Sequence, residues 1–142
     1  MKSISFFFLV LFPLISFGQT EATKIKKFIS TDDLGRFLEF LEEGNDLDDC
    51  YKIKDAEYSL LTLSIKFDCK KIFKKCLELE ADLDKSCTEK TALIYAIKYQ
   101  REHFFKKLII AGADKSIETP KGKTAMEYAV KYKRKEFISL LK

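Results

Sequence analysis

Apolar and polar positions recur along this chain with a period close to 33 residues. The segment Thr91–Ala96 (TALIYA) returns as Thr124–Ala129 (TAMEYA), 33 positions later, and Phe104 corresponds in the same way to Phe137. The pattern also occurs 32 residues earlier, where Ser59–Ser64 (SLLTLS) corresponds position by position to Thr91–Ala96. A fixed period of this length indicates a stack of like units rather than a globule with one mixed core.

Four units result, near residues 22–45, 59–82, 91–114 and 124–142. Each holds a short apolar pattern opened by Ser or Thr, whose hydroxyl can accept a hydrogen bond from an amide of the first helical turn. A second pattern of about nine residues follows with helical spacing. We predict an all-α fold of helix-turn-helix units joined by loops. The interior that the units share is expected to contain Ile72, Phe73, Leu77, Leu93, Ala96, Phe104, Leu108, Met126, Ala129 and Phe137.

The first 18 residues have the composition of a secretory signal peptide. Lys2 precedes an apolar run over residues 6–15, and the small residues Ser16 and Gly18 stand before a cleavage point. The run is shorter than the roughly 20 residues that span a bilayer as a helix. We therefore expect residues 19–142 to form an exported domain, periplasmic or secreted. The alternative is an uncleaved leader, which would make the protein a membrane-tethered scaffold.

Two motifs resemble those of ankyrin-repeat proteins. Thr91–Ala96 is similar to the family's opening Thr-Pro-Leu-His-x-Ala, and Leu108–Asp114 (LIIAGAD) is similar to its close, Leu-Leu-x-x-Gly-Ala-Asp. The resemblance implies an ankyrin-like solenoid whose units pair two helices and are joined by finger loops. It also implies a non-catalytic protein-binding module with a concave groove. The opening Pro and His are absent, and Gln100 and Lys133 replace the glycine between the helices, so the resemblance implies the same fold with lower stability.

Charge and chemistry narrow the function classes. The formal net charge is +4, less basic and less clustered than in most nucleic-acid-binding proteins. His103 is the single histidine, no Cys-x-x-Cys pair or glycine-rich phosphate loop occurs, and the carboxylates lie in linkers. We therefore expect no enzyme activity, cofactor, metal or nucleic-acid partner. We expect a monomer that binds a protein partner and contacts a membrane only if the leader is retained. A role as an immunity or accessory protein for an exported toxin or enzyme is an alternative.

Four cysteines allow three complete pairings. Cys69 and Cys76, two helical turns apart, would have Cα atoms about 10 Å from each other, beyond the reach of a disulfide. Cys50 and Cys87 both lie in linkers and form the favoured bridge. Sequence spacing leaves the other pairings open.

A lysine followed by an aromatic residue recurs near the end of each first helix. Stacking the units would align these pairs, and the family resemblance places them on the groove that contacts partners. The alternative interpretation is that the rings only pack between units. The residues proposed to bind a partner are Lys66, Phe67, Lys98, Tyr99, Lys131 and Tyr132, flanked in the linkers by Asp84, Glu89, Glu118 and Lys121.

Overall fold

The computed structural model describes the backbone of residues 17–142 and the side chains from residue 21 onwards. Residues 1–16, which hold nearly all of the predicted signal peptide, lie outside the described part. Ten elements succeed one another: α1 (Phe17–Thr31), α2 (Leu34–Glu42), β1 (Tyr51–Ile53), β2 (Ala56–Tyr58), α3 (Leu60–Lys66), α4 (Lys70–Glu78), α5 (Ala92–Lys98), α6 (Glu102–Ala111), α7 (Ala125–Lys131) and α8 (Lys135–Leu141). The protein is therefore mostly helical, as its apolar periodicity predicts.

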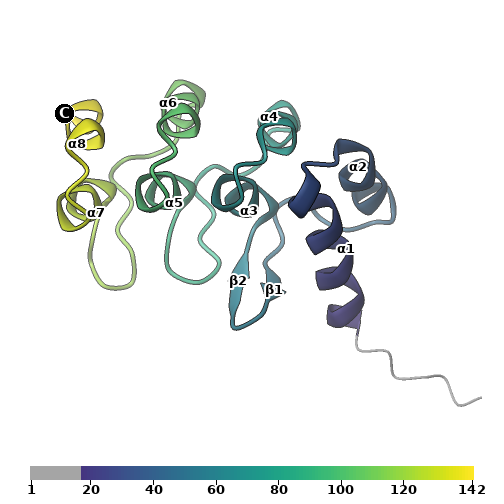
Figure 1. Cartoon of the computed structure of the whole chain (residues 1–142). Helices are drawn as coiled ribbons and strands as arrows, with labels where there is room; N and C mark the ends of the chain where they lie inside the picture. Colours follow the sequence, from purple (N-terminus) through teal and green to yellow (C-terminus); the bar gives the residue numbers. More distant parts are fainter. Residues whose placement is uncertain (1–16) are drawn as a thin grey trace, which may run out of the picture.

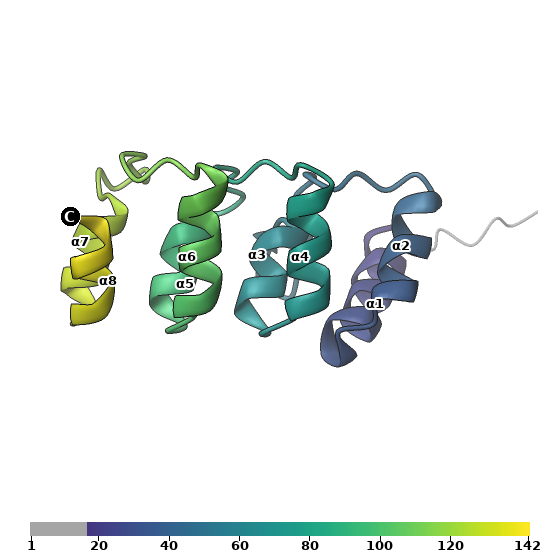
Figure 2. The ribbon, with the colours of Figure 1, turned by 90° about the horizontal axis from the view of Figure 1, so that it is seen from above.

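The helices form pairs that lie side by side. Figure 1 shows α1, α3, α5 and α7 in one row and α2, α4, α6 and α8 in a second row, with the connecting loops projecting from the first. Seen from above, the pairs follow one another from α1 and α2 to α7 and α8 (Figure 2). Helix α3 packs against α5, and α5 packs against α7. Segments about 30 residues apart in sequence are thus neighbours in space.

Aromatic side chains fill the spaces between pairs. The ring of Phe73 on α4 lies 4.4 Å from that of Phe104 on α6, and the ring of Phe105 lies 5.0 Å from that of Phe137 on α8. All four rings are buried, so each pair completes its apolar contacts with its neighbour's side chains.

Two residues predicted for the interior are only partly buried. Leu77 packs at the edge of the core because Cys76, the residue before it, occupies the buried position on α4. Met126 is also partly exposed, since no described pair lies beyond α7 and α8 to cover it. The other eight predicted residues are buried.

Hydroxyl side chains cap two of the three helices predicted to open at a Ser or Thr, which are α3, α5 and α7. Ser59 accepts from the amide of Thr62 at 3.2 Å, while Thr124 and Glu127 cap each other's backbone at the start of α7. Glu127 thereby supplies a hydrogen bond at the position where the resembled family has histidine. The expected cap at Thr91 is wrong, because its buried side chain makes no such bond.

The long linker between the first two pairs contains a β-hairpin that the sequence did not predict. Strands β1 and β2 pair antiparallel, with Tyr51 opposite Tyr58. Lys54 at the turn has φ 58°, a left-handed conformation that Asn-Gly or Asp-Gly turns usually signal. The Lys54-Asp55 sequence lacks that signal, so the hairpin was predicted as a plain loop.

The turn within each pair has a left-handed residue that is not glycine. Asp32, Asp68, Gln100 and Lys133 have φ between 49° and 60° there. This conformation costs a residue with a Cβ roughly 1–2 kcal/mol. At Asp32 this cost is offset by hydrogen bonds, because its carboxylate accepts from the amides of Lys71 and Ile72 at 2.9 and 3.0 Å. The carboxylate thereby caps α4 of the next pair.

We expect Gln100→Gly and Lys133→Gly each to raise the free energy of unfolding by about 0.5–1 kcal/mol, because glycine removes the left-handed strain. Urea denaturation followed by circular dichroism would measure the change. Asp32→Gly is the matched control, since it relieves the same strain but removes the cap of α4, and it should not stabilise. Equal stabilisation at all three positions would contradict the role given to Asp32.

Candidate functional site

Three lysine–aromatic pairs occupy equivalent places on neighbouring helices. Lys66, Lys98 and Lys131 are the last residues of α3, α5 and α7, and the aromatic residue that follows each is the helix C-cap. Because these helices lie side by side, the pairs follow one another across the first row (Figure 1). We call this surface the lysine–aromatic row; it comprises Lys66, Phe67, Lys98, Tyr99, Lys131 and Tyr132.

Each lysine of the row lies over an aromatic ring. The ammonium of Lys98 is 5.4 Å from the ring centre of Tyr99, and that of Lys131 is 5.9 Å from the ring centre of Tyr132. Lys66 lies 4.4 Å from the ring centre of Tyr58 and donates to its hydroxyl at 2.8 Å. At these distances, cation–π attraction holds the lysine ammonium groups near the rings.

No carboxylate of the described residues lies within ion-pair distance of these three lysines. Some lysines elsewhere do have such partners, and Lys106, for example, pairs with Glu102 one turn away on α6, although most exposed lysines of the described residues have none. The row is thus a cationic surface with aromatic rings and without internal neutralisation.

The rings of the row also belong to a layer of tyrosines beneath it. Tyr99 stacks parallel to Tyr95 at 6.2 Å between ring centres, and Tyr95 lies 5.8 Å from Tyr58. Tyr132 approaches Tyr128 at 5.9 Å. Burial raises the pKa of the Tyr95 hydroxyl above its ordinary value, so this tyrosine stays neutral even in moderately alkaline solution. Tyr99 and Tyr132 are half-buried by this packing, whereas Phe67 is 49% exposed.

No described hydrogen bond or ion pair joins the four linker residues predicted to flank the site to the lysine–aromatic row; three of them make contacts within or between the loops. Glu89 and Lys121 meet at 3.6 Å and join two successive loops. Asp84 accepts from the amide of Asp114 at 2.9 Å, so its carboxylate holds the loops together. Glu118 is exposed in the last loop.

Aspartates form an inter-loop ladder that the sequence reading missed. Asp46, Asp82 and Asp114 each accept from the amide two residues further on, at 2.8–3.0 Å. Asp48 and Asp84 each accept from the first aspartate of the next loop, at 2.8 and 2.9 Å. The repeated Asp-x-Asp spacing was the available signal.

Hydrogen bonds from Ser116 lower the pKa of Asp114 at the end of the ladder. That carboxylate therefore remains an ionised acceptor in moderately acidic solution.

A disulfide joins Cys50, before β1, to Cys87 in the next loop. This is the pairing that the sequence favoured. Thr88 reinforces it, since its hydroxyl accepts from the amide of Glu57 and donates to the carbonyl of the same residue. The hairpin is thus fixed to the loop that precedes α5. Cys69 and Cys76 are free and buried, and burial raises the pKa of both thiols to about 12.

An apolar pocket of about 160 Å³ opens beside Phe67. Helix α1, the hairpin and α3 meet there, and Phe67 is the C-cap of α3. Its lining residues are Ile25, Lys26, Ile29, Ser30, Ile53, Leu63 and Phe67. The pocket therefore adjoins one end of the lysine–aromatic row.

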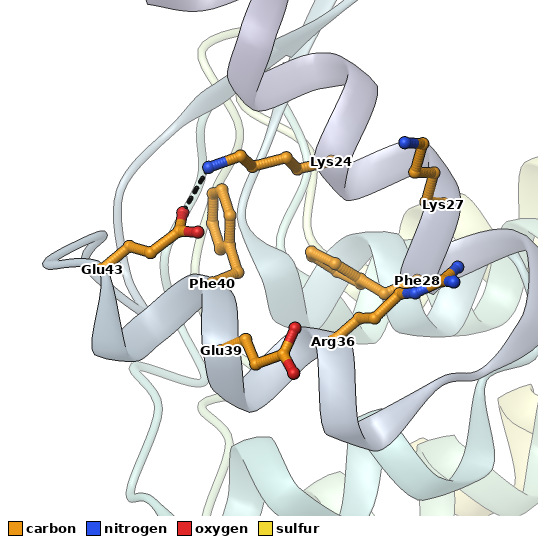
Figure 3. A pocket seen from close by; sticks show the side chains of 7 residues that line it. All are labelled: Lys24, Lys27, Phe28, Arg36, Glu39, Phe40 and Glu43. Carbon is orange, nitrogen blue, oxygen red and sulfur yellow. Dashed lines mark hydrogen bonds and ion pairs between the residues drawn. The ribbon is translucent and has the colours of Figure 1, made fainter.

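A second pocket, of about 140 Å³, lies between α1 and α2 (Figure 3). Figure 3 shows Phe28 and Phe40 between the helices, with charged side chains around them and Lys24 paired with Glu43. Arg36, which also lines it, lies 3.6 Å from Asp33. Its cations are largely balanced by neighbouring carboxylates, unlike those of the row.

Three further features of the described residues concern histidine, metal sites and membrane-spanning helices. His103 is exposed on α6. No group of three or more His, Cys, Asp or Glu side chains in residues 17–142 is arranged to hold a metal ion. Within the same part of the chain, no helix has both the length and the apolar character needed to cross a bilayer.

Comparison with known proteins adds no identification. No protein-family model matches the sequence, and no curated protein is significantly similar to it.

Proposed function

We propose that this protein is an exported, non-catalytic protein-interaction module of the ankyrin-repeat type, and that it binds its partner through the lysine–aromatic row. The observation that carries the proposal is the recurrence of a lysine over an aromatic ring at the end of α3, α5 and α7. Aromatic residues are prominent in binding hot spots, and cations without a carboxylate at ion-pair distance favour recognition of opposite charge.

The helix pairs support the ankyrin-like solenoid in this proposal. Their two rows, the loops projecting from one row and the 33-residue period are features of stacked repeats. The leader pattern and the Cys50–Cys87 disulfide favour export, because disulfides persist in oxidising compartments such as the periplasm.

Affinity capture from the native compartment with the immobilised protein tests the binding role. Simultaneous replacement of Phe67, Tyr99 and Tyr132 by alanine should abolish capture, because it removes the ring of every pair in the row. Circular dichroism and thermal unfolding would show that the variant is folded.

The matched control replaces three exposed apolar residues away from the row, Leu79, Ile110 and Leu140, by alanine. This variant should retain capture. A folded row variant that still captures the same protein would refute the proposal, as would equal loss in both variants.

A further inference from the structure

The three lysines of the row are spaced by the packing of their helices. Lys66, Lys98 and Lys131 each end one helix of the first row, and α3, α5 and α7 are in contact in that order. Axes of packed helices lie about 8–10 Å apart. A ligand that pairs with all three lysines, each above the end of its own helix, is therefore expected to offer negative groups at intervals close to this helix spacing, about 8–10 Å.

A polyproline II segment has that interval. It has three residues per turn and rises 3.1 Å per residue, so side chains at every third position share one face about 9 Å apart. A β-strand repeats on one face about every 7 Å, which falls short of the helix spacing. Segments of polyproline II type also dock on aromatic-lined grooves, and the row presents Phe67, Tyr99 and Tyr132.

An α-helical ligand fits this surface less well. Its positions seven apart would lie about 10.5 Å from each other, close to the helix spacing. However, a docked helix lays a continuous apolar stripe into an apolar groove. Beside the row, the apolar pocket lies only at the α1–α3 end, and the ends of α5 and α7 carry lysines over their rings. A further apolar pocket lies between α6 and α8, in the second row of helices.

Resting on the proposed function, we infer that the partner presents an acidic, extended segment of polyproline II type. Its carboxylates, at every third residue, would pair with Lys66, Lys98 and Lys131. An aliphatic side chain at the end near α1 would fill the pocket beside Phe67. The occupant is thus defined by charge complementarity, by spacing and by one apolar anchor.

Fluorescence polarisation with synthetic peptides and the full-length oxidised protein tests the inference. The probe is a proline-rich peptide with Glu at every third position and a leucine at one end, made in both orientations. Its reference peptide has the same composition with the glutamates in one block. We expect the spaced peptide to bind about tenfold more tightly, the combined effect of three exposed ion pairs, and to weaken as salt is added.

Charge-reversal variants identify the contact residues. Lys98→Glu and Lys131→Glu should each weaken binding of the spaced peptide by about fivefold. Lys115→Glu and Lys142→Glu make the same charge change at exposed positions in the last loop and after α8, away from the turns that carry the row, and should alter binding by less than about twofold. Lys98→Gln provides a second variant should the reversal disturb folding.

The apolar anchor has its own test. Phe67→Ala should weaken the leucine-bearing peptide about fivefold, because Phe67 lines the pocket. The same substitution should have little effect on a peptide in which serine replaces the leucine. Equal losses with both peptides would show that the pocket does not hold the anchor.

Several results would overturn the inference. They are equal affinity for the spaced and blocked peptides, tighter binding of a helical acidic peptide, or equal binding of polyphosphate through the same lysines. If no peptide binds while alanine at Phe67, Tyr99 and Tyr132 still abolishes capture, the inference fails and the proposed function stands. If capture survives that triple replacement, both fail.

Discussion

Phe105→Ala is expected to lower the free energy of unfolding by about 3–5 kcal/mol. The side chain is fully buried on α6, and its ring meets that of Phe137 on α8 edge to face at 5.0 Å. Truncation therefore opens a cavity between two helix pairs, which can relax only in part. Urea denaturation followed by circular dichroism gives the change in stability.

Ile110→Ala is the matched control, because Ile110 lies on the same helix and is 86% exposed. Its cost should stay within about 0.5 kcal/mol. Phe105→Leu, which keeps most of the volume, should cost less than Phe105→Ala and covers the case in which the alanine variant does not fold. Native-state hydrogen exchange should show the loss of protection concentrated in α7 and α8, since these helices depend on α5 and α6 for their apolar contacts. Equal effects of Phe105→Ala and Ile110→Ala would contradict a shared interior.

Removal of the disulfide by Cys50→Ser with Cys87→Ser should cost about 3–4 kcal/mol. The bridge closes a loop with a sequence separation of 37, and opening it restores conformational freedom to the unfolded chain. Thermal and urea denaturation of the oxidised protein and the double variant would measure the difference. A reducing agent should lower the stability of the parent protein to that of the variant and leave the variant unchanged.

Thiol titration checks the pairing behind that prediction. The folded oxidised protein should react slowly, because Cys69 and Cys76 are buried and their pKa values are raised to about 12. Unfolding without reduction should expose these two thiols, and unfolding with reduction should expose all four cysteines. Four reactive thiols without reduction would show that the bridge is absent.

The apolar period predicted the helix pairs well because each unit repeats the same buried positions. Residues 59–82, 91–114 and 124–142 enclose α3 to α8. The first pair is less regular, and α1 begins at Phe17, before the predicted end of the leader at residue 18. The small residues Ser16 and Gly18 predict a cleavage point, and a cleavage point does not determine where helical hydrogen bonding begins.

Contacts between units were harder to predict than the units themselves. The cap that Asp32 gives to α4 joins residues about 40 positions apart and depends on the orientation of two turns. The lysine–aromatic row was visible because each of its pairs is contiguous in sequence. The pocket beside Phe67 was not visible, since it needs α1, the hairpin residue Ile53 and α3 to meet.

The hydrogen bonds of the aspartate ladder all run in one direction along the stack, from an acceptor in one loop to a donor in the next. The first two loops each offer a carboxylate, from Asp48 and Asp84, to the amide of the first ladder aspartate in the loop that follows. Ser116 occupies the equivalent position in the last loop. Duplicating the final helix pair to make a longer protein would therefore leave the added loop without a carboxylate acceptor, because serine offers only a neutral hydroxyl. Restoring an aspartate at that position would let each new copy dock in the same register as the one before it.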